Sequence, residues 1–393
     1  MKILVCNAGS TSLKFKLWQM PEFVCLASGR VERVGSENAI FQYTSGDTGV
    51  YREPISIPDY ECGIRLFLDE LVCGKGHAID SESEIEAVGF KTVLAKGYPG
   101  VHELKEDVLD GMRAYLSVAP AHNSAYLEAI ATVHAALPNA RLIGVFETAF
   151  HQTIPLKYRL YPIPYEWYER YGVMKMGYHG ASHGYIARAL APRKRVISCH
   201  LGGSGSICAI LNGKSIDNSF GFSLQAGIPH SSRTGDADLY IVPFLLEQGL
   251  SIDEIYSELG KNGGLKGISG TSGDLRDIEK AIREGSERAQ LALDMMAASI
   301  LRYIGAYIVE LGGLDAIAFT GGVGENSARM RKMIADGLSF MGAKLDEGAN
   351  ACEKPSGLIS RPDSAVEIFV IPADEEYIVV SDTYKFCTNS EQI

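Results

Sequence analysis

The sequence predicts an α/β protein that contains a duplicated domain. Residues 2–18 and residues 194–211 share one pattern, in which an apolar strand leads through a turn of small polar residues into a second apolar strand. Elsewhere, short β-branched runs alternate with helical spacings, as in α/β domains. The length of 393 residues also suits two domains of common size. We therefore expect one domain over residues 1–150, on which a C-terminal helix (376–393) packs back, and a second domain over residues 151–375.

Composition argues against several kinds of partner and location. The formal net charge of −11 argues against nucleic acid or an anionic membrane as the main partner. Eight cysteines without a C-x-x-C pair indicate free thiols in a reducing compartment. No stretch approaches the ~20 apolar residues of a membrane span, and the N-terminus does not read as a signal peptide. We expect a cytoplasmic protein.

The first domain reads as a β-rich region followed by alternating helices and strands. Glycines at positions 29, 35 and 46 separate β-branched and aromatic runs, so the region up to about residue 57 is expected to be mostly β. Beyond it, helical spacings alternate with short continuous apolar runs. The expected strands are 23–34, 39–43, 85–93 and 142–146, and the expected helices are 62–72, 104–116 and 125–137.

A cluster of prolines between residues 149 and 164 favours a domain boundary there. In the second domain, the repeated strand pair is followed by Asn212-Gly213, a strong hairpin signal. The later expected elements are a strand over 215–222, a helix from about 278, a long core-facing helix over 286–311, a strand from 316, a glycine turn, a helix from about 327, a strand over 367–372 and the last helix.

Both strand pairs carry a turn that can bind an anion. In Asn7-Ala-Gly-Ser-Thr the small residues let backbone N–H groups approach a phosphate, and the hydroxyls of Ser10 and Ser12 add donors. Lys14 supplies a positive charge, and Asn7 offers an oxygen that could reach a metal or its water shell. Each turn alone could be an ordinary polar hairpin. Its repetition at residues 199–206 favours two phosphate-binding turns that face one cleft.

Two later segments admit both a functional and a structural interpretation. Residues 316–327 place a strand, a glycine turn and a helix start in succession, which is an arrangement that binds nucleotides but also serves packing alone. Glu375 and Glu376 follow the last strand, where they could hold Mg²⁺ or form the acidic first turn of a helix.

Five motifs follow one another along almost the whole chain. They are Asn7-Ala-Gly-Ser-Thr-Ser-Leu-Lys, Thr148-Ala-Phe-His-Gln-Thr, Gly177-Tyr-His-Gly-Ala-Ser-His, Cys199-His-Leu-Gly and Phe319-Thr-Gly-Gly-Val-Gly-Glu-Asn-Ser. As an ordered set they resemble acetate kinase and its relatives, the short-chain carboxylate kinases. The resemblance implies the duplicated actin and sugar-kinase-like (ribonuclease H-like) fold, with a nucleotide cleft between two domains, and a homodimer. It also implies reversible, Mg²⁺-dependent phosphoryl transfer from ATP to a carboxylate, which yields an acyl phosphate and ADP.

The resemblance also assigns roles to residues at matching positions. Arg233 would bind the transferring phosphoryl group and the carboxylate, which suits its planar fork. His179 would donate a hydrogen bond to the same phosphoryl group, His122 would line the site, and Asn7 and Glu375 would arrange Mg²⁺. The nucleotide-binding residues, with 202–206 against the phosphates, would be Lys14, Ser10, Ser12, His200, Gly202, Gly203, Ser204, Gly205, Asp274, Leu275, Arg276, Gly322, Val323, Glu325 and Asn326.

This chain departs from the family pattern at several positions. Lys91 stands where the family has arginine, Glu147 where it has aspartate, and Gly203 where it has asparagine. Lys91 keeps the charge but loses a two-pronged grip on a carboxylate, and Glu147 is one methylene longer. We expect both Lys91 and Glu147 to act in catalysis nonetheless.

The acyl pocket is altered as well. Its lining residues would be Lys91, Val93, Ala121, Tyr178 and Leu224, of which only Val93 matches the family residue. These changes predict altered specificity or reduced activity. Two alternatives remain open: a non-catalytic or weakly active nucleotide-binding regulatory homologue, and a kinase of the same fold that acts on a hydroxyl group. The second lacks an evident aspartate base once Glu147 replaces the family residue.

Overall fold

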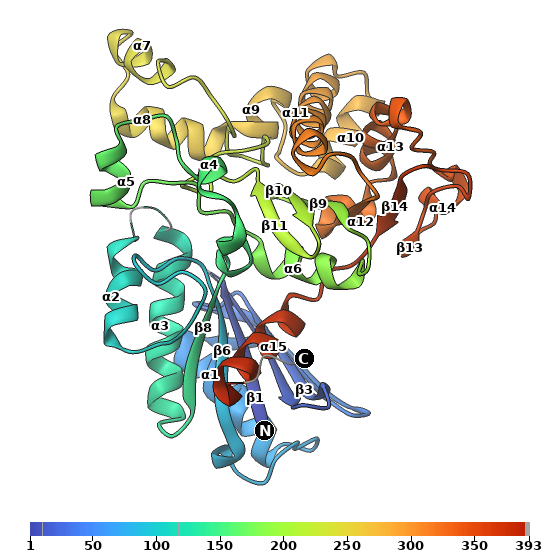
Figure 1. Cartoon of the computed structure of the whole chain (residues 1–393). Coiled ribbons are helices and arrows are strands. Elements are labelled where there is room, and N and C mark those ends of the chain that lie inside the picture. The colour runs from blue at the N-terminus through green and yellow to red at the C-terminus, as the bar shows by residue number, and fades with distance from the viewer. Residues whose placement is uncertain (10, 117, 119, 390–393) are drawn as a thin grey trace. The chain divides into compact units, whose positions relative to one another are not determined.

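The chain separates into two compact units (Figure 1). Unit 1 comprises Met1–Ala149 and Asp374–Ile393, and unit 2 comprises Phe150–Ala373. The N-terminal and C-terminal segments therefore belong to the same unit. This computed structural model describes residues 1–9, 11–116, 118 and 120–389, without the side chains of 120–122.

Unit 1 is built on a mixed sheet with the strand order β5-β4-β3-β2-β1-β6-β8-β7. β1 runs parallel to β6, and β6 runs parallel to β8, while the other neighbours are antiparallel. The strands are β1 (Lys2–Gly9), β2 (Ser12–Gln19), β3 (Val24–Glu32), β4 (Ser36–Ser45), β5 (Thr48–Ile57), β6 (Ile85–Thr92), β7 (Val101–Glu103) and β8 (Arg141–Phe146).

Helices cover both faces of this sheet. Phe15 stacks on Phe67 of α1 with the ring centroids 4.5 Å apart, whereas Val5 packs with Val379 of α15. Phe15 pairs with Cys6, the residue after Val5, and successive strand residues point to opposite faces. α1 and α15 therefore lie on opposite faces. The helical segments of unit 1 are α1 (Tyr60–Cys73), η1 (Glu82–Glu84), α2 (Glu106–Ala114), α3 (Pro120–Ala136) and α15 (Glu375–Thr388).

Unit 2 is built on a sheet with the strand order β11-β10-β9-β12-β14-β13. Its strands are β9 (Arg195–Leu201), β10 (Gly205–Leu211), β11 (Lys214–Asn218), β12 (Ala316–Thr320), β13 (Gly357–Leu358) and β14 (Glu367–Val370). Its helical segments are η2 (Ala149–Thr153), which starts at the unit boundary, α4 (Leu156–Arg159), α5 (Tyr165–Tyr171), α6 (Gly180–Ala189), α7 (Ile241–Glu247), α8 (Ile252–Ser257), η3 (Glu258–Asn262), α9 (Gly264–Ser269), α10 (Leu275–Arg283), α11 (Glu287–Leu311), α12 (Gly321–Asn326), α13 (Ala328–Gly337), η4 (Ser339–Met341) and α14 (Glu347–Asn350).

The two sheets repeat one topology, which confirms the predicted duplication. In unit 1 the order β3-β2-β1-β6-β8 consists of three antiparallel strands followed by two that run parallel to β1. In unit 2 the order β11-β10-β9-β12-β14 has the same directions relative to β9. The strand–turn–strand units recognised in the sequence are the central hairpins β1–β2 and β9–β10.

The helices α4 to α9 were not predicted, and three further details differ from the predicted elements. No strand was predicted at β7, which has only three residues and too short a pattern to detect. The strand expected over 215–222 ends at Asn218, whose side-chain oxygen accepts a hydrogen bond from Phe220 N at 2.8 Å and turns the chain. The expected glycine turn after β12 is itself the short helix α12, and Ser327 caps the next helix, α13.

The prediction that no segment is apolar enough to span a membrane was wrong for the long helix α11. Among the described residues it is the one helix that meets the length and composition of a span, with a mean hydropathy of 1.4. Its apolar side arises from core packing: Leu293, Met296, Ile300 and Ile304 are buried in the main core of unit 2. The predicted three- and four-residue spacing of these residues is confirmed.

Candidate active site

In unit 1, several predicted site residues meet at the ends of parallel strands. Asn7 lies near the end of β1, Lys91 near the end of β6, and Glu147 directly follows β8. Because neighbouring parallel strands end at the same edge of a sheet, their last residues come together there, and this edge is where open α/β sheets bind ligands. Glu375, the first residue of α15, joins them from the C-terminal segment.

Lys91 is the centre of this cluster. Its Nζ lies 2.8 Å from Oε1 of Glu147 and forms a second ion pair with Glu375. Only 17% of the Lys91 side chain and 7% of the Glu147 side chain are exposed. Burial acts to lower the pKa of Lys91, but the carboxylates of Glu147 and Glu375 raise it well above its ordinary value. Lys91 therefore stays a charged ammonium at neutral pH, held between two carboxylates.

Asn7 is oriented by Tyr126, a residue that the sequence did not single out. The Tyr126 hydroxyl donates a 2.8 Å hydrogen bond to Oδ1 of Asn7. Tyr126 is buried, and burial raises the pKa of its phenol, so the hydroxyl remains a donor. Nothing in the sequence pattern connects these residues, because they lie 119 positions apart.

The oxygens of Asn7, Glu147 and Glu375 are of the type that binds Mg²⁺, which commonly takes one or two carboxylates together with substrate phosphates. In the part of the chain that the structure describes, no three His, Cys, Asp or Glu side chains form a metal-binding group. The Lys91 ammonium also competes with a cation for both carboxylates. The residues therefore fit a Mg²⁺ ion that arrives with a nucleotide better than a permanently bound ion.

Unit 2 contains a cavity of about 570 Å³ that is lined by two glycine-containing segments and the start of α10. The predicted nucleotide-binding residues that line it are Gly202, Gly203, Asp274, Leu275, Arg276, Gly322, Val323 and Asn326. The lining residues that were not predicted are Ser231, Leu265, Gly273, Glu279 and Ser327. Gly273 belongs to a glycine- and serine-rich segment visible in the sequence, whereas Ser231 and Glu279 carry no comparable signal.

Glycine occupies two positions of the cavity wall. A Cβ at the exposed Gly322 would meet nothing within 4 Å, so a side chain has room there, whereas a Cβ at Gly273 would lie 2.4 Å from the backbone oxygen of Ser231 and would prevent this close approach. At the cavity wall, Asp274 caps α10 and pairs with Arg276 at 2.6 Å. Hydrogen bonds from Arg276 lower the pKa of Asp274 to about 2. The Arg276 side chain is 90% exposed and thus able to contact a ligand.

Other predicted nucleotide-binding residues do not line the cavity, and two of them form hydrogen bonds within the protein. The Gly205 N–H donates to Nδ1 of His230 at 3.1 Å, and the Glu325 carboxylate accepts from Gly321 N at 3.0 Å. The Ser204 hydroxyl is buried and has no hydrogen-bond partner among the described residues. Ser204 is not among the residues that line the cavity, so its hydroxyl is not placed against a ligand there.

Two predicted residues of unit 2 lie together: His200 near the end of β9 and His179 directly before α6. Their rings stack with centroids 4.0 Å apart. Nδ1 of His179 bonds to Oγ of Ser206 at 2.9 Å, and Nδ1 of His200 bonds to Oγ of Ser182 at 2.8 Å. Ser206 is fully buried, so its hydroxyl serves His179 rather than the phosphates expected at residues 202–206.

Arg233 is a partly buried cation for which the described part of the chain offers no acidic partner. Its Nη1 donates to the backbone oxygen of Leu224 at 2.6 Å, and burial lowers the pKa of its guanidinium. Among the described residues, no carboxylate forms an ion pair with it. Burying an unpaired charge is unfavourable, so this position suits an anionic ligand.

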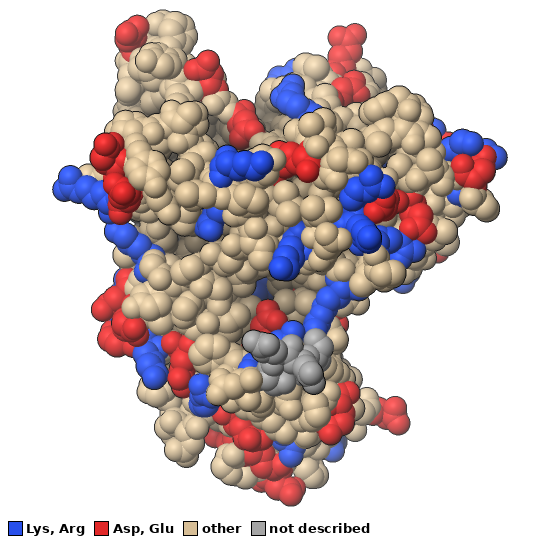
Figure 2. Space-filling view, viewed as in Figure 1, with Lys and Arg blue, Asp and Glu red and all other residues tan. Residues whose placement is uncertain are grey.

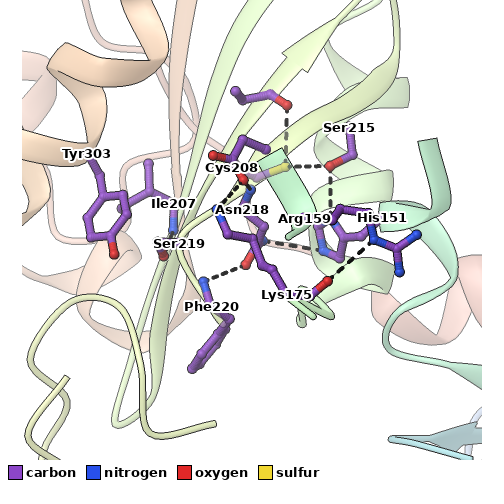
Figure 3. Close-up of polar contacts among 12 residues, drawn as sticks. His151, Arg159, Lys175, Ile207, Cys208, Ser215, Asn218, Ser219, Phe220 and Tyr303 are labelled. Carbon is purple, nitrogen blue, oxygen red and sulfur yellow. Dashed lines mark hydrogen bonds and ion pairs between the residues drawn. The ribbon is translucent and has the colours of Figure 1, made fainter. Parts of the chain in front are cut away.

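The predicted pocket residue Tyr178 is held by the fold on both sides. Its hydroxyl donates to the backbone oxygen of Phe222 at 2.7 Å. Its own carbonyl accepts from Nε2 of His151 at 2.9 Å. The Ser215 hydroxyl donates to Nδ1 of the same ring (Figure 3). Burial lowers the pKa of His151 to about 4, so the ring is neutral. Tyr178 therefore fixes the backbone directly before His179.

The remaining predicted residues lie in unit 1 or outside the described part of the chain. Lys14 is exposed and lies opposite Asn7 in the β1–β2 pair, and Ser12 pairs with Gly9. Val93 is buried just after β6. The predictions for Ser10 and for the side chains of Ala121 and His122 lie outside the described residues.

Charged side chains of both signs are interspersed on the visible face of each unit (Figure 2). The formal net charge of the chain is −11. The ligand groups described above are thus local arrangements of a few cations and N–H donors within an acidic protein.

Comparison with known proteins gives consistent results over the whole chain. Residues 2–381 match the model of the acetokinase family. An acetate kinase of Shouchella clausii is 42% identical, over 98% of this chain and 99% of its own length. The crystal structure of Porphyromonas gingivalis acetate kinase superimposes with a TM-score of 0.86 at 36% identity, covering 98% of this chain and 99% of that one. A propionate kinase from Francisella tularensis gives a TM-score of 0.87 at 31% identity, covering 97% and 98%.

Proposed function

The chain belongs to the acetokinase family and is a carboxylate kinase, and from that premise we propose that it transfers the γ-phosphoryl group of ATP reversibly to acetate or a related short-chain acid. A carboxylate oxygen bonds to the γ-phosphorus, and the bond from that phosphorus to the bridging oxygen of ADP breaks. The products are an acyl phosphate and ADP. Such a transfer requires positioning and positive charge around the phosphoryl oxygens rather than covalent work by the protein.

The main support for this proposal in unit 2 is Arg233. A partly buried guanidinium whose side chain bonds only a backbone oxygen among the described residues suits an anion, and its planar fork matches both a phosphoryl group and a carboxylate. His179 would donate to the phosphoryl group, and the cavity lined by Gly202, Gly322 and Asp274 would bind the nucleotide.

In unit 1, the ammonium group of Lys91 would attract the carboxylate substrate. Glu147 and Glu375 would hold this ammonium group in place. Asn7 and Glu375 would hold Mg²⁺ through their oxygens together with the nucleotide phosphates. When bound, Mg²⁺ would neutralise phosphate charge. The Tyr126 hydroxyl would keep the Asn7 carboxamide in one orientation.

The activity is tested by incubating the protein with ATP, Mg²⁺ and a panel of acids, and trapping the acyl phosphate with hydroxylamine. The panel includes acetate, propionate, butyrate and hydroxy acids, because the replacements at Ala121, Tyr178 and Leu224 alter the predicted acyl pocket. Hydroxamate from at least one acid is expected. If none forms while calorimetry shows ATP binding, the regulatory alternative holds; ADP release with a hydroxyl substrate would instead favour the other kinase class.

Replacing Arg233 with alanine is expected to lower kcat about 1000-fold, because the transition-state charge loses its main cation. Stability should stay the same or increase, since no ion pair is lost and a buried charge is removed. The measurements are hydroxamate kinetics and the thermal midpoint. Arg233→Lys is the matched control and should retain part of the activity. A large loss of stability in Arg233→Ala would show a structural role instead.

We also propose that the protein forms a homodimer, and the exposed apolar residues around α7 and α8 support this. Leu239, Tyr240 and Phe244 are 81%, 80% and 58% exposed, and Tyr256 on the adjacent α8 is 61% exposed. Such a patch on a soluble chain commonly marks an interface.

The dimer proposal is tested with the double variant Tyr240→Glu/Phe244→Glu and light scattering after gel filtration. The expected result is a shift from twice the chain mass of 42.6 kDa towards the monomer. Tyr51→Glu, at an exposed tyrosine in unit 1, serves as the control and should leave the mass unchanged. A wild-type monomer would contradict the proposal.

We further propose a cytoplasmic location and small-molecule partners rather than nucleic acid or a membrane. All eight cysteines, each within the described residues, are free thiols, as in proteins of reducing compartments. The net charge of −11 opposes binding to polyanions.

A further inference from the structure

A chain of alternating serine and histidine side chains leads from the interior of unit 2 to His179. Oγ of Ser198 lies 2.8 Å from Nδ1 of His183, and Nε2 of His183 lies 2.8 Å from Oγ of Ser206. Oγ of Ser206 lies 2.9 Å from Nδ1 of His179. Ser198, His183 and Ser206 are all fully buried. The proposed functional role concerns only the last ring, so the three buried residues behind it need an explanation.

The number of available protons allows only two donor–acceptor directions for this series of hydrogen bonds. Burial lowers the pKa of His183 well below its ordinary value, so its ring is neutral and carries one N–H. Each serine has one O–H proton. If His183 donates from Nδ1 to Ser198, the Ser198 proton needs another acceptor. If Ser198 instead donates to Nδ1, then His183 donates from Nε2 to Ser206.

The surroundings of Ser198 select the second direction. Among the described residues, the hydroxyl of Ser198 has His183 as its only hydrogen-bond partner. Its proton is satisfied only when it points to Nδ1 of His183, and a buried hydroxyl proton without an acceptor is unfavourable. His183 then donates from Nε2 to Ser206. The Ser206 proton is left to point at Nδ1 of His179, so a His179 ring that holds a single proton must carry it on Nε2.

We propose that Ser198, His183 and Ser206 are positioning residues that fix the Nε2–H tautomer of His179. This role rests on the proposed function, in which His179 donates a hydrogen bond to the transferring phosphoryl group. A fixed tautomer lets the neutral ring act as a donor, without first acquiring a proton. The backbone of His179 has φ 57°, a left-handed conformation that is rare for a residue with a side chain. The hydrogen bond from Ser206 holds the ring of this residue in place.

The direct test is the ¹⁵N NMR spectrum of histidine-labelled protein at pH 8, in which long-range ¹H–¹⁵N couplings distinguish the two tautomers. The His179 resonances are identified by their loss in His179→Gln. The wild-type ring is expected to carry the proton on Nε2. A ring protonated on Nδ1 would overturn the proposal. This measurement needs no catalytic activity, so its outcome is separate from failure of the hydroxamate assay.

Ser206→Ala removes the O–H donor that faces Nδ1 of His179. We expect a mixture of His179 tautomers. The kcat should fall by at most about 10-fold, and the KM for ATP should change by no more than about 2-fold. Ser206→Thr keeps the hydroxyl and should restore the single tautomer. The matched control is Thr383→Val, which removes an equally buried hydroxyl from α15 of unit 1. An unchanged His179 tautomer in Ser206→Ala, or an equal change in Thr383→Val, would refute the proposed hydrogen-bond direction.

Discussion

Replacing Lys91 with methionine is expected to lower kcat at least about 1000-fold and to destabilise unit 1 by about 3 kcal/mol. The activity falls because the ammonium proposed to attract the carboxylate is lost. The stability falls because Glu147 and Glu375 then face each other without the cation that both contact. Hydroxamate kinetics and urea unfolding measure the two effects.

The stability loss in Lys91→Met should depend on pH in a definite direction. Without Lys91, the two carboxylates will bind a proton more readily in the folded than in the unfolded chain. The contribution of these two carboxylates to stability is then most favourable below the ordinary pKa of glutamate, about 4.3, and declines as pH rises. The difference from wild type should therefore be larger at pH 8 than at pH 5.5. A loss that is independent of pH would contradict the assigned ion pairs.

Two control variants separate charge from shape at this position. Lys91→Arg keeps the charge and should stay folded, and increased turnover would show that the single-point ammonium limits catalysis. The double variant Lys91→Arg/Glu147→Asp restores the family pair, with a longer cation and a shorter carboxylate. It should retain more activity than Lys91→Arg if the two departures compensate each other in length. Equal or lower activity would show that the site has adapted to lysine.

Replacing Gly322 with phenylalanine is expected to weaken ATP binding about 100-fold, which corresponds to about 2.8 kcal/mol. Gly322 lines the 570 Å³ cavity, and a Cβ there meets no other atom within 4 Å, so the added side chain has room beside the proposed nucleotide site. The backbone at Gly322 does not have a positive φ, so the fold should tolerate the change. Calorimetric titration with ATP gives the dissociation constant.

The control for this experiment is Gly348→Phe. Gly348 also lies in a short helix of unit 2 and is exposed, but it is not among the residues that line the cavity. It should leave ATP binding within about 2-fold of wild type. If Gly322→Phe binds ATP as tightly as this control does, the cavity is not the nucleotide site.

Local sequence patterns predicted much of the fold. The two glycine- and serine-containing strand pairs are the hairpins β1–β2 and β9–β10, because alternating apolar residues and small turn residues act over a few positions. The spacing of Leu293, Met296 and Ile300 likewise predicted the core face of α11. The prediction of a turn after β12 was wrong, because glycine usually breaks helices. In the structure, residues Gly321–Asn326 between β12 and α13 form the short helix α12.

The sequence by itself determined the fold class, the duplication and the resemblance to carboxylate kinases, because periodicity and motifs depend on residues that are close together in the sequence. Tertiary structure alone decided which groups act on one another. Lys91 and Glu375 are separated by 284 positions, and Asn7 and Tyr126 by 119. No local pattern encodes such pairs; they form because α15 and α3 bring Glu375 and Tyr126 against the strands that carry Lys91 and Asn7. For the same reason, the direction of the hydrogen bonds from Ser198 to His179 follows from buried contacts and not from spacing.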